Sequence, residues 1–97
     1  MSGIWVSPLE VEQTLLEHES VAECAVIGAQ DEMGLIKPKA FITLRSSFQP
    51  GAELGATLQN FVKGKLAPYK YPRWIEFVSE LPKTATGKIQ RYRLRQS

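Results

Sequence analysis

The chain has 97 residues, of which 43% are hydrophobic and 23% are charged, a composition typical of one small globular domain. A domain of this size leaves little room for a deep, enclosed catalytic pocket, and no apolar run is long enough to span a bilayer. The single cysteine, Cys24, excludes an intramolecular disulfide, and no signal segment opens the sequence, so we expect a cytoplasmic protein with no membrane partner.

The net charge of +2 is unevenly distributed. Residues 83–97 carry five basic and no acidic side chains, whereas residues 1–82 carry seven basic and ten acidic ones. A basic end of this kind is typical of nucleic-acid binding, of contact with a phosphorylated cofactor, or of a merely exposed terminus. Only Tyr92 interleaves the basic residues as a stacking aromatic, so we expect no nucleic-acid partner.

The first expected helix begins after Ser7 and ends near His18. Ser7 is suited to act as the N-cap, Pro8 fits the first helical position, and Glu10 completes a capping box. Because His18 is the only histidine and has no neighbouring cysteine, we expect no metal held by this chain. The apolar side of the helix comprises Leu9, Val11, Leu15 and Leu16.

Two strands follow, over Val21–Ala29 and Lys39–Leu44, and the turn Gln30–Gly34 joins them into an antiparallel hairpin. Cys24 lies in the first of these strands and is expected to be a small buried hydrophobe.

The second half of the chain contains a loop and a further helix and strand. A Pro/Gly-containing loop at 46–51 precedes a helix over Ala52–Leu66, and Ala67–Pro72 is a rigid turn. Trp74–Val78 is the third strand, and Ile89–Gln96 is expected to form a short final turn or helix. This order predicts an α+β fold, a small three-stranded antiparallel sheet with packed helices.

The segment Pro82–Ile89 (PKTATGKI) carries the clearest chemical signal. Gly87 allows a positive φ or a close approach to a ligand, and the flanking threonines can shape the turn through their hydroxyls. A lysine presented on such a turn, here Lys88, suits a phosphate or a carboxylate. Taken alone, the segment fits a solvated turn equally well. It is not a Walker-type phosphate loop, because Pro82 stands where the first glycine is needed and Ile89 where Ser or Thr is needed.

Three segments carry a resemblance: Ser2–Glu12 (SGIWVSPLEVE), Leu66–Pro72 (LAPYKYP) and Pro82–Ile89. In this order and spacing they resemble the C-terminal domain of adenylate-forming enzymes, the superfamily of the acyl- and aryl-CoA synthetases. The resemblance covers residues 2–95 and looks most like benzoate-CoA and related aryl-CoA ligases. A ligase for another aromatic or cyclic acid, or for a short- or medium-chain acid, is the alternative, since these enzymes select the acid in their large N-terminal domain.

The resemblance implies a two-step reaction. A carboxylate attacks the α-phosphate of ATP, giving acyl-AMP and pyrophosphate, and the thiol of coenzyme A then displaces AMP after the small domain rotates. Lys88 would bridge the carboxylate and the α-phosphate, and Thr86 and Gly87 would shape its loop. Gly3 would leave room for the pantetheine arm of CoA, and Trp5 would pack in the same tunnel or in the core.

The resemblance also implies cofactors and partners. The full-length enzyme would use ATP with Mg²⁺ and coenzyme A, none of them bound tightly by this domain alone, and the partner would be the parent's N-terminal domain. Residues 1–97 would form one C-terminal lid domain, inactive in isolation. Acetylation of Lys88 would make a protein lysine acetyltransferase or deacetylase a further partner. Candidate contacts for the CoA phosphates, each of which a solvated surface would also explain, are Lys63, Lys65, Lys70 and Arg73.

A function of a different class is a non-catalytic, basic-tailed binding module that has kept the fold. Such a module would be expected to have lost the signature lysine or the glycine after the hinge. Both Lys88 and Gly3 are present, which favours the catalytic interpretation.

Overall fold

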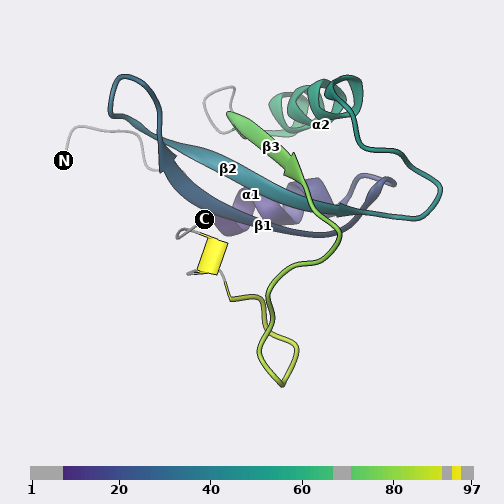
Figure 1. Cartoon of the computed structure of the whole chain (residues 1–97). Coiled ribbons are helices and arrows are strands. Elements are labelled where there is room, and N and C mark those ends of the chain that lie inside the picture. Colours follow the sequence, from purple (N-terminus) through teal and green to yellow (C-terminus); the bar gives the residue numbers. More distant parts are fainter. Residues whose placement is uncertain (1–7, 67–70, 91–92, 95–97) are drawn as a thin grey trace.

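The computed structural model describes residues 8–66, 71–90 and 93–94 (Figure 1). The elements in chain order are α1 (Pro8–Leu16), β1 (Val21–Gln30), β2 (Ile36–Leu44), α2 (Ala52–Lys65) and β3 (Trp74–Phe77). The predicted α+β class, with a three-stranded sheet and packed helices, is confirmed. No helix in the described ranges has the length and apolar character needed to cross a membrane.

Helix α1 ends at Leu16, two residues before the expected end. The backbone N–H groups of Glu17 and His18 donate to the carbonyls three residues earlier, at 3.1 and 3.0 Å, so the last turn tightens and leaves the α-helix. The imidazole Nδ1 of His18 then accepts from the Ser20 N–H at 3.1 Å, which turns the chain into β1. The expected N-cap, Ser7, lies outside the described residues.

Strands β1 and β2 pair antiparallel, as predicted, and β3 forms the third strand in the order β1-β2-β3. Strand β2 begins at Ile36, three residues before the expected start at Lys39. Pro38 accounts for the error, because a proline usually argues against an interior strand position. Its carbonyl nevertheless accepts from the N–H of Arg73 at 2.8 Å.

The prediction that all three strands run antiparallel was wrong, because β3 is parallel to β2. Helix α2 lies between these two strands in the sequence and carries the chain back to the end of the sheet where β2 began (Figure 1). A strand, a crossover helix and a second strand in one sheet make a parallel pair, which a short hairpin turn cannot do. The sheet is therefore mixed.

Helix α2 starts and ends close to the predicted residues. Its first turn carries Glu53 and its last turn carries Lys63 and Lys65, so the side-chain charges complement the helix dipole. It ends one residue before the expected Leu66, whose backbone is extended.

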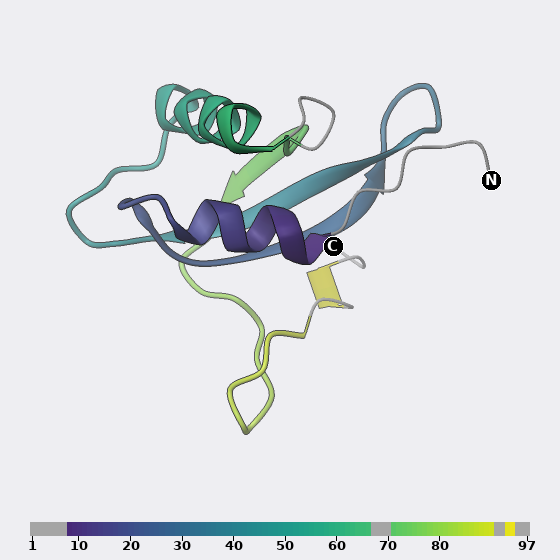
Figure 2. The same cartoon turned by 180° about the vertical axis from the view of Figure 1, so that it is seen from behind.

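Both faces of the sheet bury apolar side chains, because alternate residues of a strand point to opposite faces. One face packs against α1 and α2, which lie on the same side of the sheet (Figure 2). The opposite face packs against the segment that follows β3. The helix-side cluster is Val11, Leu15, Val21, Cys24, Val26, Ala40, Ile42, Leu58 and Val62. The opposite cluster is Ala25, Ile27, Phe41, Leu81 and Leu94, with Val78 and Ile89 packed against it.

Glu12 joins α1 to the outer edge of the sheet although it is a buried acid. Its side chain is 6% exposed, and its Oε2 accepts from the backbone N–H of Val26 at 2.8 Å. Its backbone carbonyl lies 3.4 Å from the sulfur of Cys24, which donates to it. Cys24 is only 3% exposed, which confirms the prediction of a buried cysteine. Within the described residues β1 pairs with β2 alone, so the Glu12 carboxylate satisfies an amide at the sheet edge that this ladder leaves open.

Replacing this carboxylate should destabilise the fold. We expect Glu12→Ala to lower the free energy of unfolding of the 97-residue chain by about 1–3 kcal/mol, because the buried Val26 amide loses its acceptor. Urea denaturation of the two proteins measures the difference. Gln13→Ala, at the exposed neighbouring position, should change the value by no more than about 0.5 kcal/mol and serves as the control. Equal effects at the two positions would contradict the role of Glu12.

Candidate functional site

Residues 82–90 form a hairpin, which we call the C-terminal hairpin and which projects from the sheet in both views (Figures 1 and 2). Lys83 and Ile89 face each other in an antiparallel bridge. The Thr84 N–H donates to the Lys88 carbonyl at 2.8 Å, and the Gln90 N–H donates to the Pro82 carbonyl at 2.8 Å. Ile89 and Gln90 therefore belong to this hairpin, which corrects the expectation that a short final turn or helix begins at Ile89. In the described part of this last segment only Arg93 and Leu94 are helical.

The tip of the hairpin has the turn chemistry that the sequence predicted. The Gly87 N–H donates to the Thr84 carbonyl at 2.9 Å, and Gly87 has a φ of +90°, in the left-handed region. This is the three-residue hairpin loop in which the last residue is left-handed, a position that favours glycine. The Thr84 hydroxyl accepts from the Lys88 N–H at 3.1 Å and lies 2.9 Å from the Thr86 hydroxyl. Local hydrogen bonds alone thus define the shape of the tip.

The base of the hairpin is anchored on the sheet face opposite the helices. Leu81 is 4% exposed, and Ile89 packs beside it against Ala25 and Phe41. Apolar contact therefore holds the two arms of the hairpin against the sheet, while the tip extends beyond it.

Lys88 lies at the exposed end of this rigid unit. Its ammonium makes no ion pair or hydrogen bond with the residues that the structure describes, although its backbone is bonded on both sides to Thr84. A charged donor that is exposed and unpaired in this part of the molecule is available to an anion, and a phosphate or a carboxylate suits an ammonium. The hairpin therefore carries an exposed ammonium whose chemistry suits an anionic ligand.

Of the remaining predicted site residues, those that the structure describes lie on α2 or just before β3 and not in the hairpin: Lys63, Lys65 and Arg73. Gly3, Trp5 and Lys70 lie outside the described residues. Lys63 lies over the ring of Tyr71, with its Nζ 4.3 Å from the ring centroid.

Lys65 and Arg73 are each paired with a carboxylate. The ammonium of Lys65 lies 3.3 Å from a carboxylate oxygen of Glu17, and the guanidinium of Arg73 lies 3.6 Å from one of Glu32. The first pair connects α2 with the end of α1, and the second reaches the turn between β1 and β2. Each of the described basic candidates therefore contacts a different partner, and the structure does not bring these side chains together into one anion site.

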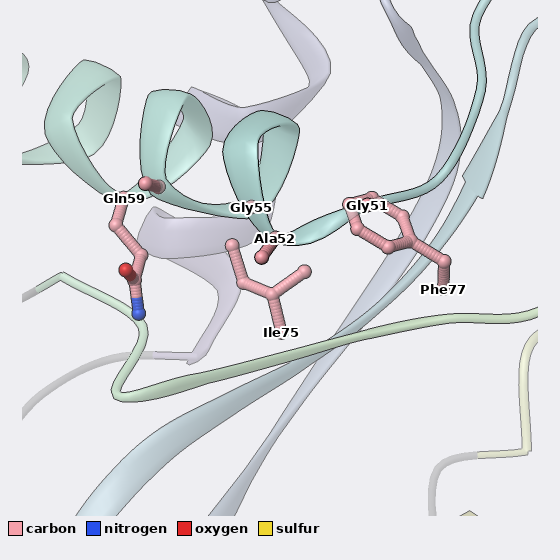
Figure 3. Close-up of a pocket in the computed structure, with 7 residues that line it drawn as sticks. Gly51, Ala52, Gly55, Gln59, Ile75 and Phe77 are labelled. Atoms are coloured by element: carbon pink, nitrogen blue, oxygen red, sulfur yellow. The ribbon is translucent and has the colours of Figure 1, made fainter.

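A shallow groove of about 340 Å³ lies between α2 and β3 (Figure 3). The Gln59 amide closes one end by donating to the carbonyls of Pro72 and Arg73, at 2.9 and 3.2 Å. Small and apolar residues form the rest of the lining, and none of the described lining residues is titratable. The lining residues are Gly51, Ala52, Gly55, Ala56, Gln59, Ile75 and Phe77. The described lining therefore shares no residue with the hairpin.

One contact of the hairpin was not predicted from the sequence. The ammonium of Lys83 forms an ion pair with the carboxylate of Glu23 in β1, at 2.5 Å. The two residues are sixty positions apart, and no spacing or motif in the sequence connects them.

A substitution at Gly87 should loosen the hairpin without a steric clash. No atom lies within 4 Å of the position that a Cβ at residue 87 would take, so Gly87→Ala meets only the backbone cost of the left-handed conformation, about 1–2 kcal/mol. We expect hydrogen exchange at the Thr84 and Gln90 amides to become about five- to thirty-fold faster. Gly64→Ala is the matched control, because it also meets open space but lies in α2, where alanine is favoured over glycine. Unchanged exchange at Thr84 in Gly87→Ala would contradict this account of the turn.

The comparisons with known proteins agree with this geometry. Residues 10–88 match the family model described as the AMP-binding enzyme C-terminal domain. The chain is 62% identical over 95 residues to a benzoate-CoA ligase of Thauera aromatica, covering 98% of the chain and 18% of the relative. It is 56% identical over 98 residues to a 4-hydroxybenzoate-CoA/benzoate-CoA ligase of Rhodopseudomonas palustris, covering 99% and 18%.

A solved structure gives the same result. The fold matches the crystal structure of the anthranilate CoA ligase AuaEII in complex with anthranoyl-AMP, with a TM-score of 0.90 and 58% identity, over 99% of this chain and 19% of that one. The chain thus spans about a fifth of the length of these relatives. The family match covers most of the chain and includes Lys88, and the resemblance found in the sequence is confirmed. The chain belongs to the family of AMP-binding enzyme C-terminal domains.

Proposed function

We propose that this chain is the C-terminal lid domain of an AMP-forming carboxylate-CoA ligase and that it supplies Lys88 to the step that activates the acid. The observation that carries the proposal is the exposed ammonium of Lys88 on a hairpin that local hydrogen bonds make rigid. Residues 1–97 would form this one domain, and the large N-terminal domain of the parent would be its partner.

The chemistry of activation explains why such a cation is needed. The carboxylate oxygen forms a bond to the α-phosphorus of ATP while the bond from that phosphorus to pyrophosphate breaks. Two anions approach each other, and charge builds up on the phosphoryl oxygens. A positively charged donor between the carboxylate and the α-phosphate offsets the repulsion and orients the attack. We assign this role to Lys88 and the shaping of its turn to Gly87 and Thr86.

The acid is proposed to be aromatic, with benzoate as the first choice. The supporting observations are the names of two relatives at 62% and 56% identity, both ligases of benzoate, and the anthranoyl-AMP bound in the similar solved structure. A 4-hydroxybutyrate-CoA ligase of Metallosphaera sedula is 50% identical, and the human acyl-coenzyme A synthetase ACSM1 is 52% identical. The first of these names a short-chain acid, which keeps a ligase for a short- or medium-chain acid as the alternative.

The groups that would bind to the full enzyme fit this domain only in part. The hairpin cation suits the phosphate and carboxylate of the first step, and Gly3 and Trp5 stay predictions for the path of CoA. The described residues contain no cluster of three or more side chains that could hold a metal ion. The Mg²⁺ that accompanies ATP stays a prediction for the full enzyme.

Regulation by acetylation at Lys88 also stays a prediction, together with the acetyltransferase or deacetylase that it needs and the cytoplasmic location. Two points support acetylation: Lys88 is exposed, and acetylation would remove the charge on which the proposed role of Lys88 depends.

Lys88→Ala in the full-length ligase should separate the two half-reactions. We expect acyl-AMP formation to slow by about 10²–10³-fold, because a charged donor to the transition state is lost. The thioester formed from supplied acyl-AMP and CoA should appear at an unchanged rate. Pyrophosphate release measures the first step and thioester production the second. Lys37→Ala on β2 removes a charge outside the hairpin and should leave both rates unchanged; equal loss of both steps in Lys88→Ala would refute the assignment.

The isolated chain tests the proposed division of domains. Because the pockets for adenine, ribose and the acid would lie in the other domain, we expect the 97-residue chain to release no pyrophosphate from ATP and benzoate. Turnover by the chain alone, confirmed by loss of that turnover in its own Lys88→Ala variant, would show that the division is wrong.

A further inference from the structure

The ion pair between Lys83 and Glu23 is the one polar contact found between the side chains of the C-terminal hairpin and the rest of the described chain. The ammonium and the carboxylate lie 2.5 Å apart, and the two side chains are 37% and 43% exposed. Leu81 and Ile89 supply the apolar anchor beside this pair. The ion pair therefore reaches from β1 to the arm of the hairpin that precedes the tip.

An irregularity in β1 sets the direction of Glu23. Val21 pairs with Leu44 and Glu23 with Thr43, so Ala22 is one extra residue on the β1 side, a β-bulge. Strict alternation would place Val21 and Glu23 on the same face. The bulge separates them, because Val21 belongs to the helix-side cluster whereas Glu23 shares the face of Ala25. The bulge thus places the carboxylate of Glu23 on the face of the sheet on which the hairpin is anchored.

The hairpin has two faces of its own. Lys83 and Ile89 are opposite each other in the bridge, so their side chains point to the same face, and Ile89 packs onto the sheet cluster. Lys88 is adjacent to Ile89 and must point to the other face. When the face that carries Lys83 and Ile89 packs against the sheet, the ammonium of Lys88 therefore points away from the sheet.

We propose that the Glu23–Lys83 ion pair is a positioning device that sets the orientation of the hairpin and so the location of the Lys88 ammonium during acid activation. The proposal rests on the proposed function of Lys88. Lys83 acts through Lys88 and is a positioning residue. The ion pair is exposed, and exposed pairs have small energies, so we expect its loss to change the population of the correct orientation by about two- to five-fold.

Neutralising either partner in the full-length ligase tests the proposal. Glu23→Gln and Lys83→Gln should each lower kcat for acyl-AMP formation by about two- to five-fold, with smaller changes in the KM values for ATP and the acid. The double variant should be no slower than the slower single variant, because each substitution alone already removes the pair. Lys83→Arg keeps the charge and should keep the rate. Thioester formation from supplied acyl-AMP should be unchanged in all four proteins.

A second ion pair of the same kind is the matched control. Lys39 and Glu76 connect β2 to β3 at 3.7 Å, with side chains 28% and 55% exposed. This pair has no hydrogen bond or ion pair to the hairpin within the described chain. Glu76→Gln should therefore leave both half-reactions unchanged, whereas Glu23→Gln slows the first one.

The outcomes distinguish the two proposals when Lys88→Ala is measured in parallel. If Glu23→Gln forms acyl-AMP at the wild-type rate while Lys88→Ala loses that activity, the positioning role is overturned and the function of Lys88 is left intact. Equal slowing of both half-reactions in Glu23→Gln would also overturn it, since that pattern indicates a general structural defect. Unchanged adenylation in Lys88→Ala would remove the proposed function, and the positioning role with it.

Discussion

The sheet of this domain must be covered on both faces, and most of the structure follows from that constraint. Strands β1 and β2 carry apolar side chains on both faces of the sheet. Exposing either face to water would cost free energy, because apolar surface is unfavourable in water. The two helices cover one face. The chain after β3 covers the other through Leu81, directly before the C-terminal hairpin, and through Ile89 at the base of the hairpin. The contact that completes the core thereby also places the hairpin that carries Lys88.

The hairpin combines two kinds of constraint. Its tip is defined locally, by the left-handed Gly87 and by bonds between Thr84 and Lys88. Its orientation is defined by contacts with the sheet, through apolar packing at the base and the ion pair to Glu23. A rigid tip on an anchored base is what a charged donor needs when it must reach an anion bound elsewhere, because catalysis by a charged group depends on its placement.

The match to the AMP-binding C-terminal family relates this domain to longer proteins. The matched relatives are about five times as long as this chain, and the resemblance covers nearly all of the chain. The chain therefore corresponds to one domain of these longer relatives, and Lys88 lies within the residues that match the family. The contacts of Lys63, Lys65 and Arg73 with rings and carboxylates show that their charge also serves the domain itself, which weakens sequence arguments that assign them to a ligand.

The sequence by itself determined the local features. Residue periodicity identified both helices and the three strands to within a few residues, and the Thr/Gly turn with Lys88 was recognisable because its bonds join residues within five positions of one another. The tertiary structure decided what depends on distant residues. It made β3 parallel to β2, because the crossover helix returns the chain, and it placed Ile89 and Gln90 in the hairpin and not in a separate final turn or helix. It also brought Lys83 to Glu23. A bulge turned that carboxylate to the hairpin face, and no local pattern encodes a contact between side chains sixty residues apart.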